Sequence, residues 1–337
     1  MENVKVSIIC TAYNHADYIE QTLNGFLSQK FSYTYEILIH DDASTDATAE
    51  IIRKYEEKYP KIIKAVYQKE NQYSKGIMAT KILLDMAEGE YIALCEGDDY
   101  WNDSQKLQRQ IVFLDEHPEY SASIHSGYYA YEDGIIKRKL FRAYKENRDV
   151  PIEELLSKWV CPTASIVYRR ECRRQYDLGY GKNLPCGDFP LLVYLATKGK
   201  IYYIDSAMCV YRTMSKSSLS LKRKDNKELN RKMDEKFIRL LEAIDQALGK
   251  KYKEVIKKHI MQREFSRMVA EKDWKQIKKK EYQEYYLNLS WKKKLQIYLG
   301  YISPRFFGKI ENKMIILRNQ IEYIKDKRYN KNKSINV

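Results

Sequence analysis

The chain has 337 residues and a formal net charge of +14, and 44% of its residues are hydrophobic. This length suits two domains, or one domain with a long extension, and the small numbers of Gly and Pro exclude a low-complexity chain. No stretch reaches the roughly 18 apolar residues of a spanning helix, so we expect no transmembrane segment.

The positive charge belongs to the C-terminal third. Residues 213–337 hold 33 Lys and Arg against 15 Asp and Glu, a net charge of +18, whereas residues 1–212 have a net charge of −4. This asymmetry suggests an anionic partner for the tail, such as a membrane surface, nucleic acid or a polyanion.

Short apolar runs alternate with helical patterns from the N-terminus onward. The predicted strands are Val4–Cys10, Glu36–His40, Ile62–Tyr67 and Tyr91–Leu94. A first helix opens at Asp17, with Glu20 in a capping-box position; a second carries Ile51, Ile52 and Tyr55, and a third surrounds Ile77–Ala87. Strands alternating with helices predict a parallel sheet covered on both faces.

Polar residues follow three of these strands. In parallel sheets, ligands bind beyond the carboxyl ends of the strands, so we expect these polar segments to meet at one edge. That edge would collect Tyr13, Asp41, Asp42, Glu96, Asp98 and Asp99.

The segment Glu96-Gly97-Asp98-Asp99 places three carboxylates within four residues. Closely packed like charges repel, and a bound cation is the usual remedy. Mg²⁺ and Mn²⁺ take one or two carboxylates together with the phosphates of a ligand. The alternative is a solvated acidic turn.

The pattern continues beyond Trp101. We expect a helix that runs through Leu107, Ile111 and Leu114 to Pro118. A second helix is expected over Leu191–Thr197, after a turn from Pro185 to Pro190. Further strands are predicted at Ser121–Tyr129, Pro162–Tyr168, Lys200–Ile204 and Met208–Tyr211. A boundary near Ser215–Lys224 precedes helices at Leu229–Leu248, Lys251–Val269 and Lys275–Leu287.

Four segments, in order, carry a resemblance to a known family. Val6–Asn14, His40–Asp46, Gly89–Trp101 and Cys186–Phe189 resemble the motifs of family 2 glycosyltransferases, over roughly residues 3–212. The resemblance implies a GT-A fold, a Rossmann-like mixed sheet flanked by helices. Residues 1–215 would be the catalytic domain, with a nucleotide-sugar half (1–101) and an acceptor half (102–215), and residues 216–337 a basic, mostly helical extension.

The resemblance also implies roles for residues. Thr11, Tyr13 and Asp42 would bind uridine, where a Tyr face can stack on a base. Asp98 and Asp99 would bind metal and ribose, and Glu96 stands where the family usually has Asp. The remaining alternatives are that Tyr13 only packs on the first helix and that Asp41 or, more in keeping with its position, Asp46 only caps the second.

Asp188 is the predicted catalytic base. Inversion at an anomeric carbon needs a carboxylate that takes the proton of the attacking hydroxyl, as in inverting glycosidases. The alternative for Asp188 is a cap of the following helix, which Pro190 in its first turn would suit. Trp101 and Phe189 either shape the acceptor site or belong to the core.

The expected function is therefore inverting, metal-dependent transfer of a sugar from a UDP-linked donor to a glycan or lipid-linked acceptor of a bacterial surface polysaccharide. The alternatives are a nucleotidyltransferase and a basic protein that binds nucleic acid. Residues 291–333 combine aromatic, aliphatic and lysine residues and suggest contact with an anionic membrane, against the alternative of a packed helical appendage.

The remaining residue types are less informative. The six cysteines form no zinc or C-x-x-C pattern, and with no signal peptide pattern we expect reduced thiols in the cytoplasm. The five histidines form no ligand pattern and receive no role.

Overall fold

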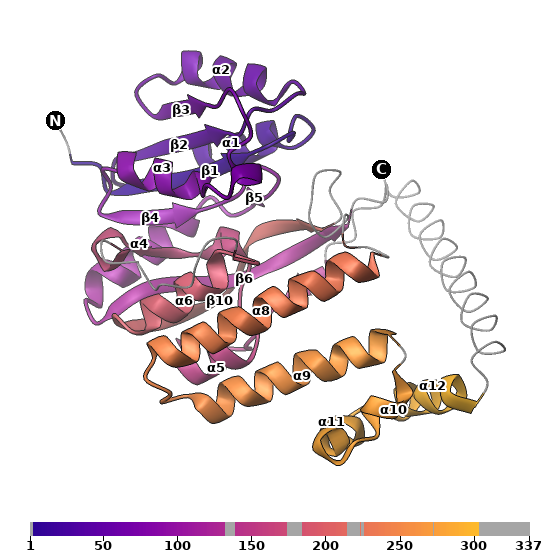
Figure 1. Cartoon of the computed structure of the whole chain (residues 1–337). Helices are drawn as coiled ribbons and strands as arrows, with labels where there is room; N and C mark the ends of the chain where they lie inside the picture. Colours follow the sequence, from indigo (N-terminus) through magenta and orange to yellow (C-terminus); the bar gives the residue numbers. More distant parts are fainter. Residues whose placement is uncertain are drawn as a thin grey trace, which may run out of the picture. The chain divides into compact units, whose positions relative to one another are not determined.

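The computed structural model describes residues 3–131, 139–173, 184–213, 223, 226–271 and 273–302. The chain divides into two compact units, 1–256 and 257–337, which Figure 1 shows coloured along the sequence. The division falls inside α9 (Lys253–Glu271). The predicted boundary at Ser215–Lys224 lies almost wholly outside the described residues.

The first unit is built on one ten-stranded mixed sheet (Figure 1). The order is β3-β2-β1-β4-β9-β6-β10-β5, with β7 beside β6 and β8 beside β10. β1 to β4 are parallel, β9 is antiparallel to β4 and β6, and β10 is parallel to β6. The strands are β1 Val6–Ala12, β2 Tyr35–Asp41, β3 Ile63–Tyr67, β4 Tyr91–Leu94, β5 Tyr100–Trp101, β6 Tyr120–Tyr131, β7 Lys139–Phe141, β8 Arg148–Asp149, β9 Val167–Arg169 and β10 Lys200–Thr213.

The helices of the first unit alternate with these strands, as predicted. They are α1 Ile19–Leu27, α2 Thr48–Lys58, α3 Ala79–Met86, α4 Lys106–Glu116, α5 Ile152–Ser157, α6 Asp188–Ala196 and α8 Lys227–Ala247. The predicted capping box at the start of α1 was wrong. Tyr18 is the N-cap and makes no side-chain capping bond. The N–H groups of Tyr18 and Ile19 instead donate to the backbone carbonyl of His15.

The last two predicted strands of this unit are one strand. β10 runs from Lys200 to Thr213 and stays paired with β6 through register shifts between Ile204 and Cys209. Such shifts interrupt the alternation of apolar residues, which explains why the sequence pattern indicated two strands. The predicted strand at Pro162–Tyr168 begins with a 3-10 turn, Thr163–Ser165, and only its last two residues belong to the short β9.

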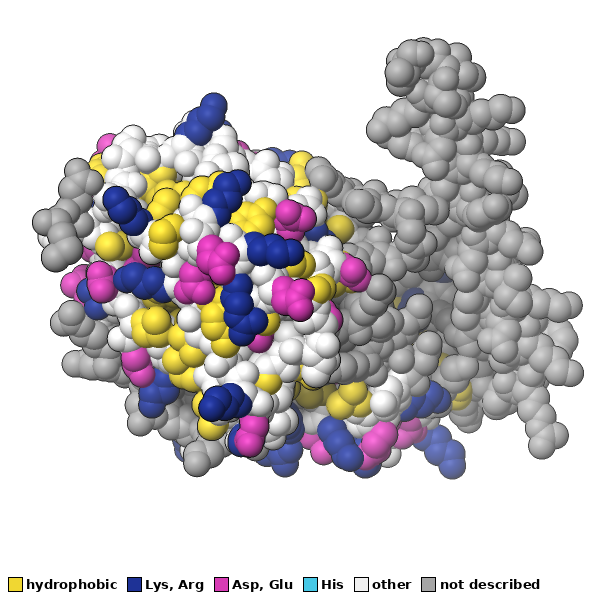
Figure 2. All heavy atoms as spheres, turned by 90° about the horizontal axis from the view of Figure 1, so that it is seen from above, with side chains coloured by type: hydrophobic (Ala, Val, Ile, Leu, Met, Phe, Trp, Pro, Cys, Tyr) yellow, Lys and Arg dark blue, Asp and Glu magenta, His cyan; other side chains and the backbone are white. Residues whose placement is uncertain are grey.

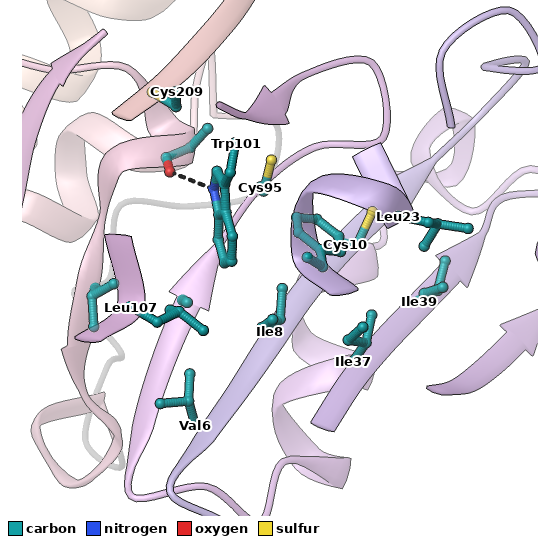
Figure 3. Packing of buried hydrophobic residues seen from close by; sticks show 14 of the residues in the cluster. Val6, Ile8, Cys10, Leu23, Ile37, Ile39, Cys95, Trp101, Leu107 and Cys209 are labelled. Atoms are coloured by element: carbon teal, nitrogen blue, oxygen red, sulfur yellow. Dashed lines mark hydrogen bonds between the residues drawn. The ribbon is translucent and has the colours of Figure 1, made fainter. Parts of the chain in front are cut away.

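The core lies on both faces of the parallel strands. Figure 3 shows Ile8 and Cys10 of β1 beside Ile37 and Ile39 of β2, all fully buried. Trp101 is only 3% exposed, and its indole N–H donates to the Ala164 carbonyl at 2.9 Å. Trp101 is therefore a core residue, one of the two interpretations left open above.

A lysine is fully buried beneath this core. The Lys106 amine lies 4.1 Å from the centre of the Trp101 ring and donates to the Gln110 side chain at 2.8 Å. Burial lowers the pKa of Lys106 to about 7, although nearby Cys209 and Cys95 act in the opposite direction. A buried amine with one hydrogen-bond acceptor is therefore close to neutral at physiological pH.

The lowered pKa of Lys106 predicts that the free energy of unfolding depends on pH. Between about pH 7 and the ordinary lysine pKa of 10.5, the unfolded chain binds a proton that the folded chain has lost, so the free energy of unfolding rises with pH. Lys106→Met should remove a few kcal/mol of that rise, at about 1.4 kcal/mol per pKa unit. Denaturant unfolding at pH 7 and pH 10 measures it, with exposed Lys69→Met as control. The same rise in both variants would contradict the prediction.

The second unit has a small core of its own. Phe265, Ile277, Tyr282 and Ile297 are buried together. The predicted helix Lys275–Leu287 is interrupted: α10 (Trp274–Ile277), a 3-10 turn and α11 (Gln283–Leu287) replace it, and α12 (Trp291–Ile302) follows. The part of the segment 291–333 that follows α12 lies outside the described residues.

Candidate active site

Three loops meet at one edge of the sheet. The register places Ala12 of β1 beside Asp41 of β2, and Ile9 of β1 beside Leu94 of β4. Beyond the strands, the Asp42 N–H donates to the Ala12 carbonyl and the Gly97 N–H donates to the Thr11 carbonyl, each at 2.9 Å. The predicted convergence of the three polar segments is confirmed.

Side chains join the first two loops. The Asn14 N–H donates to the Ser44 hydroxyl at 2.9 Å, and the Thr45 N–H donates to the Asn14 side-chain oxygen at 2.8 Å. Asn14 and Ala43 have φ of 55° and 60°, in the left-handed region that residues other than Gly rarely adopt. The reciprocal hydrogen bonds hold the two loops in this conformation.

Asp46 holds the start of α2. Its carboxylate accepts the N–H groups of Ala16 at 3.1 Å and Thr48 at 2.9 Å, together with the Thr48 hydroxyl. Burial acts to raise the pKa of Asp46, but these hydrogen bonds outweigh it and the pKa lies below its usual value. The N-cap of α2 is Ala47, so Asp46 binds the Thr48 N–H from one residue before the cap rather than as the cap itself.

Asp42 organises the loop after β3. Asp42 is 5% exposed, and its carboxylate accepts the N–H groups of Gln72 at 2.6 Å and Tyr73 at 3.1 Å. Tyr13 lies one residue beyond the carbonyl that binds Asp42, with 36% of its surface exposed, and Thr11 is partly buried. These hydrogen bonds bring together the loops that carry Tyr13, Asp42 and Tyr73 at the same edge of the sheet.

Asp98 lies beside a histidine that the sequence did not single out. One carboxylate oxygen is 3.9 Å from the His15 Nε2, and Asp98 is 9% exposed. Burial lowers the pKa of His15, while Asp98 acts to raise it. A Cβ at position 97 would lie only 2.9 Å from the His15 Nδ1, which explains why a glycine occupies this position of the acidic segment.

Asp99 differs from Asp98 in its surroundings. It is fully buried, and one carboxylate oxygen accepts the Arg212 N–H at 2.9 Å, while the other has no hydrogen-bond partner. Burial, followed by repulsion from Asp98 and Glu96, raises the pKa of Asp99 well above its ordinary value. Asp98, at 9% exposed, is the more accessible of the two predicted metal ligands.

The predicted base lies at the first residue of α6. The Asp188 carboxylate accepts the Thr163 hydroxyl at 3.0 Å and the Phe189 N–H at 2.9 Å. Burial raises its pKa, and these two hydrogen bonds partly offset the rise. A partly buried carboxylate with a raised pKa is suited to accept a proton near neutral pH.

Electrostatic interaction connects Asp188 with the acidic segment. Glu96 is solvent-exposed, but the surrounding protein displaces part of its hydration. This loss of hydration, together with repulsion from Asp98 and Asp188, raises the pKa of Glu96 to about 8. Partly buried Tyr211 of β10 lies within electrostatic range of all four carboxylates. Burial raises its pKa most, and the charges of Asp99, Glu96, Asp98 and Asp188 raise it further. The four carboxylates therefore belong to one site.

The site fits a divalent cation that a ligand helps to hold. Within the described ranges, no group of three or more His, Cys, Asp or Glu side chains could bind a metal alone. Mg²⁺ and Mn²⁺ commonly need only one or two carboxylates when phosphates supply the other ligands. The mutual repulsion of Glu96 and Asp98 is what such a cation would relieve.

Comparison with solved structures supports the fold. S. aureus TarS in complex with UDP superposes with a TM-score of 0.55 over 87% of this chain and 78% of that one, at 19% sequence identity. With its mixed sheet and acidic edge, the first unit has a GT-A fold. The model for glycosyl transferase family 2 matches residues 7–176, and the chain belongs to that family.

Curated relatives are similar over part of their length. Rv1520 of Mycobacterium tuberculosis, an uncharacterised protein, is 39% identical over 212 residues, which are 61% of this chain and 58% of the relative. WfaP of Escherichia coli, named as a UDP-Glc:α-D-GlcNAc-diphosphoundecaprenol β-1,3-glucosyltransferase, is 39% identical over 132 residues, 39% of this chain and 49% of that protein. The chain thus spans less than two thirds of the length of these relatives.

Family membership bears on the two alternatives. It gives neither a nucleotidyltransferase nor a nucleic-acid-binding protein any support. On the face shown in Figure 2, basic and acidic side chains of the described residues are interspersed with apolar ones rather than gathered into a basic patch. Among the described helices, none has the length and apolar content needed to span a bilayer.

Proposed function

We propose that this protein is an inverting glycosyltransferase that transfers a sugar from a UDP-linked donor to an acceptor in bacterial surface polysaccharide synthesis. The observation that carries the proposal is the meeting of the loops after β1, β2 and β4 at one edge of the sheet, which includes the acidic segment Glu96–Asp99. Family membership supports the reaction class, and the UDP in the TarS structure supports the donor class.

The donor would lie across the carboxyl ends of β1, β2 and β4. Tyr13 would stack on the base, Asp42 would accept the imide N–H of uracil, and Thr11 would line the same segment. The Asp42 carboxylate already orders Gln72 and Tyr73, so the base site would be formed before the donor arrives. Such preorganisation lowers the entropy cost of binding.

Asp98 would hold a divalent cation together with the diphosphate, and Glu96 would contact the ribose or the cation. A bound Mn²⁺ or Mg²⁺ would neutralise the charge that develops on the departing nucleotide. His15, 3.9 Å from Asp98, would fix the orientation of that carboxylate. Asp99 would keep β10 in register with the acidic segment through the Arg212 N–H.

The base would be Asp188. It takes the proton of the acceptor hydroxyl as that oxygen forms a bond to the anomeric carbon, while the bond from this carbon to the phosphate oxygen breaks and UDP leaves. The Thr163 hydroxyl and the Phe189 N–H hold the carboxylate in place during the transfer. Attack opposite the leaving group inverts the anomeric configuration.

A nucleotide screen tests the donor class. UDP with Mn²⁺ should raise the unfolding temperature of the full chain, equivalent to about 2.7 kcal/mol at one hundred times the dissociation constant. GDP and dTDP in parallel samples show whether the site selects uracil. Stabilisation by GDP or dTDP alone would exclude a UDP donor, and no response to any nucleotide would contradict the proposed function.

The acceptor would be a glycan or a lipid-linked glycan reached at the cytoplasmic face of the membrane, and α12 provides a surface for attachment. Trp291, Leu295 and Tyr298 lie at helical spacing and are 70%, 46% and 53% exposed, whereas Ile297 is buried in the core of the second unit. Lysines 292–294 adjoin this stripe. A lysine-flanked aromatic stripe suits an anionic bilayer interface.

Vesicle flotation tests this attachment. The full chain should float with phosphatidylglycerol vesicles at low salt, and the triple variant Trp291→Ala, Leu295→Ala, Tyr298→Ala should lose most of that binding, because each anchor contributes buried apolar area. Leu287→Ala is the matched control, since Leu287 is 59% exposed on the neighbouring α11. If the unaltered chain stays unbound at low salt, the attachment proposal fails.

A further inference from the structure

The backbone of His15 is fixed where the loop after β1 meets α1. Its N–H donates to the Thr48 hydroxyl at 2.8 Å. Its carbonyl accepts the N–H groups of Tyr18 at 2.9 Å and Ile19 at 2.8 Å. Because the main chain is held on both sides of the Cα, the direction in which the side chain leaves the loop is fixed as well.

The imidazole of His15 is packed against the acidic segment. Its Nε2 is 3.9 Å from an Asp98 carboxylate oxygen, and each of the two side chains keeps 12% of its surface exposed, so an ion from solvent can reach the gap. On the other edge of the ring, a Cβ at position 97 would lie 2.9 Å from Nδ1. The Tyr18 ring meets the imidazole in an edge-on arrangement, with the ring centres 6.3 Å apart. The ring therefore presents Nε2, rather than Nδ1, to Asp98.

The gap between His15 and Asp98 is too wide for a direct hydrogen bond. An N–H···O bond spans about 2.7–3.2 Å between nitrogen and oxygen, and this separation is 3.9 Å. Donor atoms that share a divalent cation lie about 2.1 Å from it, so two of them are about 3.0 Å apart at a right angle and about 4.2 Å apart across the ion. The separation of Nε2 from the Asp98 oxygen falls within that range. A single bridging water is the other occupant that such a gap accommodates.

Nothing in the described part of the chain fixes the tautomer of His15. Its Nδ1 is buried and has no hydrogen-bond partner among the described residues. Whatever binds Nε2 therefore decides which ring nitrogen carries the proton. A cation at Nε2 requires the proton on Nδ1, and the unpaired Nδ1 leaves that tautomer available.

We propose that His15 binds the divalent cation of the donor site through Nε2, together with Asp98 and the diphosphate, and that the site therefore selects Mn²⁺ over Mg²⁺. The inference rests on the proposed function, because it adds a ligand and a metal preference to that same site. Through a shared cation, His15 would orient the Asp98 carboxylate across a distance that no direct hydrogen bond spans.

A nitrogen ligand changes which cation the site prefers. Asp98 and the phosphates supply oxygens, which suit Mg²⁺ and Mn²⁺ alike. Mg²⁺ is the harder ion, prefers oxygen ligands and loses its waters reluctantly, whereas first-row transition ions accept imidazole more readily. The imidazole of His15 would therefore shift the preference of the site toward Mn²⁺.

Electron spin-echo spectroscopy of the full chain with UDP and Mn²⁺ tests the inference. We expect modulation from ³¹P, which shows that the nucleotide holds the ion, together with modulation from a directly bound ¹⁴N. In a chain that carries ¹⁵N only in its histidines, a ¹⁵N signal should replace the ¹⁴N signal. This labelling needs no substitution, so the result does not depend on whether a variant folds.

Substitutions identify which histidine is bound. His15→Gln should lose the nitrogen modulation and keep that of ³¹P, whereas His117→Gln should keep both. His117 is the matched control, because it is a partly buried histidine at the C-cap of α4, where its Nδ1 contacts the Phe113 carbonyl at 2.8 Å. Calorimetry should show tighter UDP binding with Mn²⁺ than with Mg²⁺, and His15→Gln should reduce that ratio about tenfold or more.

The same samples separate this inference from the proposed function. Modulation from ³¹P without any from a histidine nitrogen, as a bridging water would give, would overturn the inference. So would nitrogen modulation that survives His15→Gln, or a preference for Mn²⁺ that this variant leaves unchanged. Absent ³¹P modulation with retained UDP binding would remove the cation site and the inference with it, whereas absent UDP binding by the unaltered chain would refute the proposed function.

Discussion

Asp188→Asn is expected to abolish most sugar transfer while leaving UDP affinity within about twofold. Asn has the shape of Asp and can still accept the Thr163 hydroxyl, but it cannot take a proton from the acceptor. Loss of a general base typically costs 10²- to 10⁴-fold in rate. The measurements are turnover with a UDP-sugar donor and UDP binding by calorimetry in the same preparation.

The pH profile sharpens this prediction. Because burial raises the pKa of Asp188, the base is protonated at acidic pH, and transfer should rise as the pH increases through that raised pKa. Asp188→Asn should lack this rise in its residual activity. Asp85→Asn, on the exposed face of α3, is the control and should behave as the unaltered chain. Full turnover by Asp188→Asn would remove this residue from the mechanism.

Asp98→Asn is expected to remove the part of UDP affinity that depends on a divalent cation. A neutral amide cannot replace a carboxylate ligand of Mn²⁺, so the gain in affinity on adding Mn²⁺ should fall about tenfold or more. Metal-free UDP binding should change little, because the base and ribose contacts remain. Calorimetry with and without Mn²⁺ measures the difference directly.

Asp99→Asn provides the comparison for that experiment. Asp99 is held with a raised pKa and accepts the Arg212 N–H, so a neutral Asn should preserve both the hydrogen bond and the response to Mn²⁺. If Asp99→Asn loses the response to Mn²⁺ and Asp98→Asn keeps it, the roles assigned to these neighbouring carboxylates are reversed.

Local pattern predicted much of the first unit. The alternation of apolar runs and helical faces indicated β1 to β4 and α1 to α3, and parallel strands dictated that the polar segments after Ala12, Asp41 and Leu94 share an edge. That rule needs only chain order and strand direction. Breaks in pattern caused the errors, as where register shifts divided β10 into two predicted strands.

The rest of the site depends on contacts between distant residues. The Arg212 N–H and the Asp99 carboxylate form a hydrogen bond although they are 113 residues apart, and Thr163 and Asp188 do so at a separation of 25 residues. No local spacing in the sequence indicates either pair. Tyr211 and His15 were missed for the same reason, since each is an ordinary residue until the fold places carboxylates around it. The complete burial of Asp99 is likewise invisible in the sequence.

The most direct test of the account is a crystal structure with UDP and Mn²⁺, in which anomalous scattering locates the metal. We expect the Mn²⁺ peak beside the Asp98 carboxylate and the diphosphate, with uracil against Tyr13 and the β-phosphate on the side of Asp188. A nucleotide bound away from the ends of β1, β2 and β4, or a metal peak distant from Asp98, would contradict the central claim that these carboxylates surround a diphosphate.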